Sequence, residues 1–274
     1  MKKEERNRRR RFGQNFLIDQ GFTKRIVDAA SLTKEDTVLE IGPGAGALTF
    51  LLAEKAGTVF GVEKDPLQAL SLTKALQDKH VQNASVLTAD ITTYQYLKHF
   101  PKTYDGIGDF IVVANLPYYA ASHIIQMLVA APVRPKRVIA MVQKEVGERI
   151  CAKPGDFSVL TLAIQWFADA RPLFDVPPEA FQPRPNVVSQ VIELTPKKES
   201  ALPASKIDEA KAFRVAKIGF SSKRKKLSNN IASGLTIPRE TVENLLVELG
   251  LRPDIRAEEL GVENWLDVAK KILP

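Results

Sequence analysis

Glu40-Ile41-Gly42-Pro43-Gly44-Ala45-Gly46 is the stretch of sequence that decides the fold. An apolar run over residues 37–42 predicts a buried strand before it, and a helical pattern follows over residues 48–55. Glycines at alternate positions let the backbone turn tightly and approach a ligand closely. The third glycine comes one residue earlier than in the dinucleotide pattern G-x-G-x-x-G. The loop therefore predicts a ligand site other than a standard dinucleotide site, with a plain strand-to-helix turn as the alternative.

Apolar runs alternate with helical patterns on the C-terminal side of this loop. Strands are predicted over residues 58–63, 84–88, 110–114 and 138–142, and a helix over residues 67–76. This alternation is typical of parallel strands with helices on both faces, so we expect an α/β, Rossmann-like fold. Residues 187–194 predict one further strand, which we expect as an antiparallel edge that closes the sheet.

The chain changes character near residue 195. Residues 195–205 hold two prolines and small residues and are interpreted as a linker. From residue 206 onward the pattern is helical, without a strand candidate. A chain of 274 residues fits one large and one small domain. We therefore expect a domain over residues 1–195 with a basic N-terminal arm, and a small all-helical domain over residues 206–274.

Composition and charge narrow the class of protein. The chain is 45% hydrophobic and 26% charged, has one cysteine and no internal disulfide, and shows no apolar run of membrane-spanning length. We expect a cytoplasmic protein, because no apolar run follows the basic start. The net charge is +7, and basic residues gather in residues 2–11 and 211–226. Two basic tracts favour a polyanionic partner such as nucleic acid over a merely solvated surface.

Acidic side chains follow the next two predicted strands. Glu63 ends the second strand, where an acid can accept hydrogen bonds from both hydroxyls of a ribose. Asp90 follows the third strand, where it can accept from an adenine amino group. Acids around a loop without lysine or arginine favour a cationic sulfonium cofactor, S-adenosylmethionine, over a diphosphate. Asp65 is a second candidate for the ribose, but we interpret it as the cap of a helix that starts at Pro66.

Asn115-Leu116-Pro117-Tyr118 ends the fourth predicted strand, at the edge where open parallel sheets place their active sites. The side-chain carbonyl of Asn115 and the backbone carbonyl of Leu116 can each accept one N–H of an adenine amino group. This draws the nitrogen toward tetrahedral geometry and directs its lone pair at a methyl donor. Pro117 fixes the orientation of the preceding carbonyl, and Tyr118 can stack on the purine.

Two aromatic residues follow this loop, and neither is assigned a catalytic role. We interpret Tyr119 as a packing residue and His123 as a surface or half-buried histidine rather than an acid–base group. No pattern of metal ligands stands out in the sequence, so no metal is expected.

The sequence resembles the small-subunit ribosomal RNA adenine dimethyltransferases, the kasugamycin-resistance group. The resemblance rests on residues 11–17, 40–46, 115–118, 143–146, 181–189 and 220–230. It implies a class I S-adenosylmethionine-dependent methyltransferase that places two methyl groups on each of two adjacent adenosines near the 3′ end of small-subunit ribosomal RNA. The expected partner is an assembling 30S-type particle, and the chain is expected to be a monomer.

The resemblance also assigns residues to the cofactor and to the RNA. For the cofactor they are Asn15, Leu17, Gly42, Gly44, Glu63, Asp90 and Asn115. For the RNA the resemblance implies Phe181 at the flipped base, beside Tyr118. The concentration of charge, rather than the resemblance, assigns Arg10, Arg11, Lys223, Arg224, Lys225 and Lys226 to phosphate contacts. A core aromatic before a proline turn is the alternative interpretation of Phe181.

Three other functions remain open from the sequence. The large-subunit ribosomal RNA adenine methyltransferases of macrolide resistance share the loops and the reaction. A mainly non-catalytic RNA-binding assembly or transcription factor is the alternative from another class, although the intact acids and residues 115–118 argue against lost catalysis. A DNA adenine methyltransferase is disfavoured by the segments that resemble the ribosomal RNA enzymes.

Overall fold

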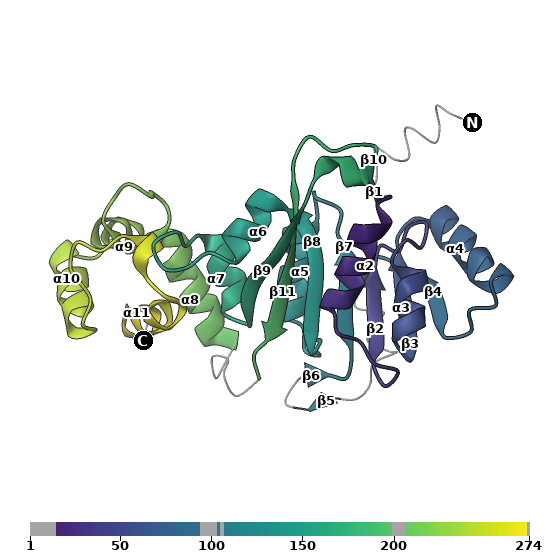
Figure 1. Cartoon of the computed structure of the whole chain (residues 1–274). Coiled ribbons are helices and arrows are strands. Elements are labelled where there is room, and N and C mark those ends of the chain that lie inside the picture. The colour runs from purple at the N-terminus through teal and green to yellow at the C-terminus, as the bar shows by residue number, and fades with distance from the viewer. Residues whose placement is uncertain (1–14, 94–102, 105–106, 199–205, 273–274) are drawn as a thin grey trace. The chain divides into compact units, whose positions relative to one another are not determined.

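The computed structural model describes residues 15–93, 103–104, 107–198 and 206–272 (Figure 1). The chain divides into two compact units by its internal contacts. One comprises residues 1–147 and 168–196, and the other comprises residues 148–167 and 197–274. The first unit is an α/β unit and the second is built from helices, so we describe each by itself.

A seven-stranded sheet forms the centre of the α/β unit. Its strands, in spatial order, are β4 (Ala84–Thr88), β3 (Thr58–Glu63), β2 (Thr37–Ile41), β7 (Ile111–Asn115), β8 (Arg137–Gln143), β11 (Ser189–Pro196) and β9 (Ala168–Val176). The first five are parallel, and the last two run antiparallel to their neighbours. The predicted α/β class is confirmed, and the predicted strand over residues 84–88 has the observed bounds.

The prediction that residues 187–194 form the edge strand of the sheet is wrong in one respect. The strand predicted over residues 187–194 is β11, but it lies between β8 and β9, so β9 is the antiparallel edge. The sequence pattern did not indicate β9 because it contains Pro172 and three charged residues and its burial does not alternate regularly. Proline lacks the N–H that a central strand needs, whereas an edge strand can leave that position without a partner.

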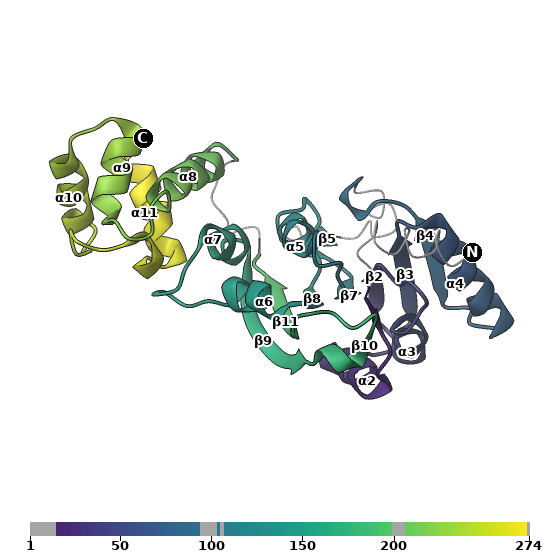
Figure 2. The ribbon, with the colours of Figure 1, turned by 90° about the horizontal axis from the view of Figure 1, so that it is seen from above.

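Helices cover both faces of the sheet. Figure 2 shows α2 (Gln20–Ala29) and α3 (Thr49–Lys55) on one face and α5 (Ala121–Val129) on the other. The core on the α2–α3 side joins residues of these helices to β2, β3, β7 and β8. Helix α4 (Pro66–Asp78) starts where expected, because Asp65 accepts a hydrogen bond from the Leu67 N–H over 3.0 Å.

Two short antiparallel pairs lie outside the main sheet. Strand β1 (Phe16–Leu17) pairs with β10 (Phe181–Gln182), so that Leu17 lies opposite Phe181. The main-chain N–H of Ile18 extends this pairing by donating to the carbonyl of Ala180 over 2.8 Å. The other pair is β5 (Thr103–Tyr104) with β6 (Ile107–Gly108). The β1–β10 pair joins two segments that were assigned to the site separately.

The second unit holds α7 (Val159–Gln165), α8 (Lys206–Gly219), α9 (Leu227–Leu235), α10 (Arg239–Glu248) and α11 (Val262–Ile272), while α6 (Lys144–Ile150) crosses the division between units. This division differs from a single cut near residue 195, because residues 148–167 group with the C-terminal helices. The N–H groups of Gly155 and Phe157 both donate to the carbonyl of Glu258, and Trp166 packs on Phe213. Across the described ranges, we find no helix with the length and hydropathy of a membrane span.

Candidate cofactor and catalytic site

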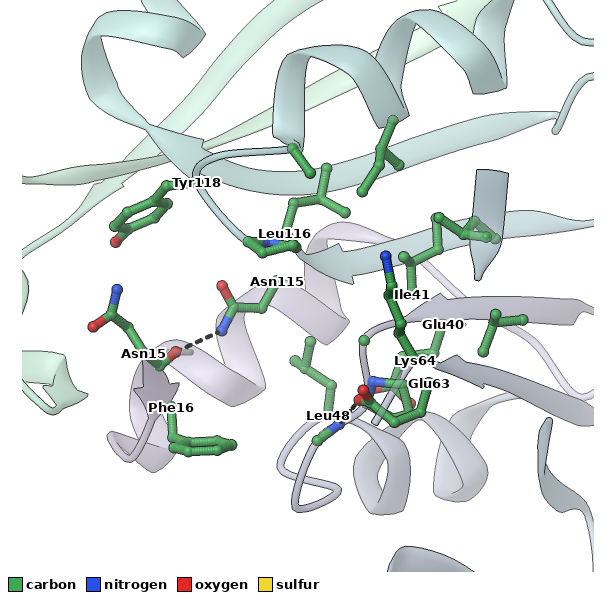
Figure 3. A pocket seen from close by; sticks show the side chains of 18 of the residues that line it. Asn15, Phe16, Glu40, Ile41, Leu48, Glu63, Lys64, Asn115, Leu116 and Tyr118 are labelled. Carbon is green, nitrogen blue, oxygen red and sulfur yellow. Dashed lines mark hydrogen bonds between the residues drawn. The ribbon is translucent and has the colours of Figure 1, made fainter. Parts of the chain in front are cut away.

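A cavity of about 540 Å³ opens at the carboxyl ends of the parallel strands. Its walls come from six segments of the α/β unit, namely residues 15–18, 40–45, 47–48, 62–64, 89–92 and 115–120 together with 123–124 of α5. Figure 3 shows side chains from these segments pointing into one space. Small-molecule sites occupy about 300–1,000 Å³, so the cavity has the size of a nucleoside-bearing ligand. Among the described residues, no group of three or more potential metal ligands occurs.

The loop after β2 adopts backbone conformations that favour glycine. Gly42, Gly44 and Gly46 have φ values of 68°, 55° and 87°. A side chain on Gly46 would place its Cβ 2.5 Å from Cδ1 of Leu72, so this glycine lets the loop pack against α4. A Cβ on Gly44 would meet the ring of Phe16 at 3.2 Å. The loop therefore presents bare backbone to the cavity, and Phe16 of β1 lies close to it.

Glu63 is held from two sides at the end of β3. One carboxylate oxygen accepts the Gly44 N–H over 3.0 Å, and the other accepts the Asp65 N–H over 2.9 Å. The residue is only 5% exposed, and this burial raises the pKa of its carboxyl. Both oxygens keep further acceptor capacity toward the cavity. Asp65 does not line the cavity and caps α4, so the geometry favours Glu63 as the ribose acceptor.

Asp90 also lines the cavity, two residues beyond the end of β4, the strand that pairs with β3. One oxygen accepts two hydrogen bonds from Thr92, at 3.0 Å from its N–H and 2.7 Å from its hydroxyl. The other oxygen is 2.7 Å from the ammonium of Lys64. Hydrogen bonds from Lys64 and Thr92 lower the pKa of Asp90 to about 2. Sequence reasoning missed Lys64, because the pairing depends on two strand ends that meet only in the folded sheet.

Glu40 is a second acid that sequence reasoning did not assign. It is the second-last residue of β2, lines the cavity and is 1% exposed. Burial raises its pKa to about 8, so the carboxyl is mainly protonated at pH 7. Its position at the start of the glycine-rich stretch of residues 40–46 is a signal, but the spacing does not indicate that the side chain is buried.

Asn115 is the last residue of β7 and points into the cavity (Figure 3). Its side-chain nitrogen donates to the main-chain carbonyl of Asn15 over 3.4 Å. This leaves the side-chain carbonyl oxygen free of that bond and directed toward the cavity. The Leu116 N–H donates to the Met141 carbonyl over 3.2 Å, which fixes the loop on β8. Asn115 and Leu116 therefore lie side by side in the lining of the cavity.

A turn closed by the Ala120 N–H and the Pro117 carbonyl carries both tyrosines of the loop. Tyr118 is half-buried, and burial raises the pKa of its phenol. The interpretation of Tyr119 as a packing residue is wrong, because its side chain is 66% exposed at the rim of the cavity. The turn gives the two adjacent side chains different surroundings, which composition alone does not indicate. His123 is exposed and also lines the cavity.

The structure does not bring Phe181 into the cavity. Its side chain is 3% exposed and belongs to the core on the α2–α3 side of the sheet. Its backbone instead pairs with Leu17, which is buried and lines the cavity. This is the position of a core aromatic, the alternative that the sequence left open.

The family model for ribosomal RNA adenine dimethylases matches residues 5–273. The chain belongs to this family. A ribosomal RNA small subunit methyltransferase A of Dehalococcoides mccartyi is 37% identical over 94% of this chain and 86% of its own length. The protein of the same name from Lachnoclostridium phytofermentans is 37% identical over 95% of this chain and 90% of its own length.

Solved structures agree with the family assignment. A dimethyladenosine transferase from Plasmodium falciparum superposes with a TM-score of 0.77 at 25% identity, over 94% of this chain and 97% of the other. The 23S rRNA methyltransferase ErmE superposes with a TM-score of 0.70 at 26% identity, over 94% of this chain and 99% of the other. This ribosomal RNA adenine dimethylase therefore has the class I fold and is an S-adenosylmethionine-dependent methyltransferase.

The basic residues assigned to RNA fall into two groups. Arg10 and Arg11 lie outside the described residues. Lys223, Arg224, Lys225 and Lys226 are all exposed in the connection between α8 and α9. The buried side chain of Asn230 anchors this connection by donating to the carbonyls of Gly219 and Ser222, over 2.6 and 2.9 Å. The dimethylase thus presents four adjacent cations on a fixed support in its helical unit.

Proposed function

We propose that this protein transfers methyl groups from S-adenosylmethionine to the N6 amino groups of two adjacent adenosines near the 3′ end of small-subunit ribosomal RNA. We further propose that it acts as a cytoplasmic monomer on an assembling 30S-type particle. The observation that carries the proposal is the orientation of Asn115, whose amide nitrogen is bonded to Asn15 and whose oxygen faces the cavity. The two relatives at 37% identity, both named for the small subunit, support this choice over the large subunit.

The walls of the cavity fit the cofactor. Glu63 would accept the ribose hydroxyls, because Gly44 and Asp65 hold its carboxylate in place. Asp90 would accept the adenine amino group through acceptor capacity that remains on its carboxylate beside the bonds from Thr92 and Lys64. The backbone at Gly42 and Gly44 would approach the methionine part. Asn15 and Leu17 would cover the cavity from β1, which β10 fixes in place.

The bound cofactor supplies an electrophilic methyl group on a sulfonium. The residues of this chain position the incoming amino nitrogen and stabilise the charge that develops on it. Oδ1 of Asn115 and the carbonyl of Leu116 each accept one N–H, which withdraws the nitrogen lone pair from the purine ring. Pro117 fixes the carbonyl before it, and Tyr118 stacks on the base. No strong base is needed, because the proton leaves after the nitrogen has been alkylated.

Basic residues that do not line the cavity would supply the energy for extruding the base. Extrusion of a base from a stack costs a few kcal/mol. The cations at residues 223–226, with Arg10 and Arg11, would offset this cost through phosphate contacts. Phe181 would act from the core: by fixing Leu17 it supports the wall beside which the base binds, and we propose that role ahead of direct stacking on the base.

Methyl transfer to purified ribosomal particles tests the proposal. Unmethylated small subunits, large subunits, their free RNAs and duplex DNA would be incubated with labelled cofactor, and the products mapped. We expect four methyl groups on two adjacent adenosines in small-subunit particles. Modification confined to large-subunit RNA would instead show the specificity of the macrolide-resistance enzymes. Cofactor binding without transfer to any substrate would favour a non-catalytic factor.

A further inference from the structure

The hydroxyls of Tyr118 and Ser189 form a hydrogen bond of 2.7 Å that the chemistry above does not use. Tyr118 is a half-buried residue of the catalytic loop, whereas Ser189 is fully buried at the start of β11. The two residues are 71 positions apart in the chain. They meet because β11 pairs with β8, which in turn pairs with β7, the strand that leads into the loop. The bond therefore ties the loop to the antiparallel part of the sheet.

Ser189 is a rigid support for this bond. In the sheet it lies opposite Gln143 of β8 on one side and Val176 of β9 on the other. The preceding residue, Val188, accepts the Lys144 N–H over 3.0 Å. Ser189 cannot shift without breaking strand pairing on both of its sides.

A polar cluster next to Ser189 braces the same strand end. The side chain of Gln190 donates to one oxygen of Asp175 over 3.0 Å, and the Lys144 ammonium is 2.5 Å from the other oxygen. Residues 143–146 and 181–189 were singled out in the sequence without any role for Lys144 or Ser189 in catalysis. In the structure the two segments are joined by the bond between Lys144 and Val188, next to the residue that bonds to Tyr118.

We propose that Ser189 is a positioning residue that holds the ring of Tyr118 in the orientation required for stacking on the target adenine. The proposal rests on the function proposed above. The phenol oxygen lies on the Cβ–Cγ axis, so a bond to it fixes the direction of the ring. Because phenol hydrogen bonds lie near the ring plane, the bond also favours one plane. The ring is thus ordered before RNA binds, and binding does not have to supply that order.

The first test is Ser189→Ala in the full chain. We expect kcat for methyl transfer to unmethylated small-subunit particles to fall about tenfold, as for loss of one neutral hydrogen bond. The dissociation constants for cofactor and particle should change less than about twofold, because neither depends mainly on the ring. Ser158→Ala is the matched control, since this buried serine caps α7 and does not contact Tyr118. An equal loss of kcat in both variants would show a general effect of stability and overturn the proposal.

A double-mutant cycle supplies the second test. Tyr118→Phe keeps the ring and removes the same bond from the other end, without a change in β11. If the bond carries the effect, the double variant should be no slower than the slower single variant. Additive losses would overturn the proposal, as would an unchanged kcat in Tyr118→Phe, which also decides the matter if Ser189→Ala does not fold. Wild-type protein that transfers no methyl group would refute the proposed function itself, whereas normal transfer in all variants would refute only the role of Ser189.

Discussion

Asn115 and Asn15, one hundred residues apart, are joined by a hydrogen bond of 3.4 Å from the side-chain amide of the first to the main-chain carbonyl of the second. The bond has two consequences for the site. It uses the donor end of the Asn115 amide, so the acceptor end is free of this bond, as the proposed mechanism requires. It also ties the loop after β7 to the residue before β1, so the segment proposed to cover the cofactor and the residue proposed to bind the target are directly linked.

Substitution of Asn115 tests the first consequence. Asn115→Ala removes one of the two acceptors, and we expect the rate of methyl transfer to fall by about 10²–10³, by analogy with the loss of an oxyanion-hole donor. Cofactor binding should remain measurable by calorimetry, because Glu63 and the glycine loop are unchanged. Asn83→Ala is a suitable control, since this asparagine also bonds main-chain carbonyls but lies outside the cavity. Near-normal turnover of Asn115→Ala would remove this residue from the mechanism.

Glu63→Ala should weaken the cofactor far more than the RNA. A ribose left without its acceptor loses about 1–3 kcal/mol, which corresponds to about a 5- to 150-fold increase in the dissociation constant. Asp65→Asn is the comparison, because Asp65 caps α4 and does not line the cavity. It should lower the melting temperature slightly and leave cofactor affinity within about twofold. The reverse pattern in calorimetry would assign the ribose to Asp65.

Glu40 should make folding stability depend on pH. Burial raises the pKa of Glu40 in the folded protein to about 8, from an ordinary value of 4.5. At this residue the folded state therefore binds more protons than the unfolded state between these values, so the contribution of Glu40 to stability falls as pH rises from about 4.5 to about 8. Glu40→Gln should remove this contribution, with a limit of about 1.4 kcal/mol per pH unit. Urea unfolding at pH 5, 6, 7 and 8 would measure it, and the exposed residue Glu54 supplies the control, Glu54→Gln. Parallel stability curves for wild type and Glu40→Gln would contradict the prediction.

The features that could be predicted from the sequence are those that local residue patterns determine. The parallel strands and the helix capped by Asp65 follow from apolar periodicity and a local cap, and Gly42, Glu63, Asp90 and Asn115 come together because parallel strands end at one edge. It did not predict interactions that depend on which strands become neighbours. The pair of Lys64 with Asp90 and the exposure of Tyr119 both depend on the folded geometry.

The four cations between α8 and α9 provide the last prediction, which separates an RNA enzyme from an enzyme that modifies free nucleosides. Free adenosine would supply every group that the cavity recognises, so these cations matter only for a phosphate-bearing substrate. Replacing Lys223, Arg224, Lys225 and Lys226 by glutamine should weaken binding to small-subunit particles and leave cofactor affinity unchanged. Each lost phosphate contact should reduce the slope of log K against log salt by about 0.7–0.9.

A control variant with the same change in charge makes this test specific. Lys24, Lys55, Lys153 and Lys270 are also exposed but are scattered over both units. Particle binding would be measured over a salt series for the wild type and both variants. If net charge alone attracted the RNA, the two variants would lose affinity and slope equally. A larger loss for residues 223–226 would place phosphate contacts on that connection, because only a local contact distinguishes four adjacent charges from four dispersed ones. Equal slopes in all three proteins would mean that these side chains are only solvated, and that the RNA binds another surface.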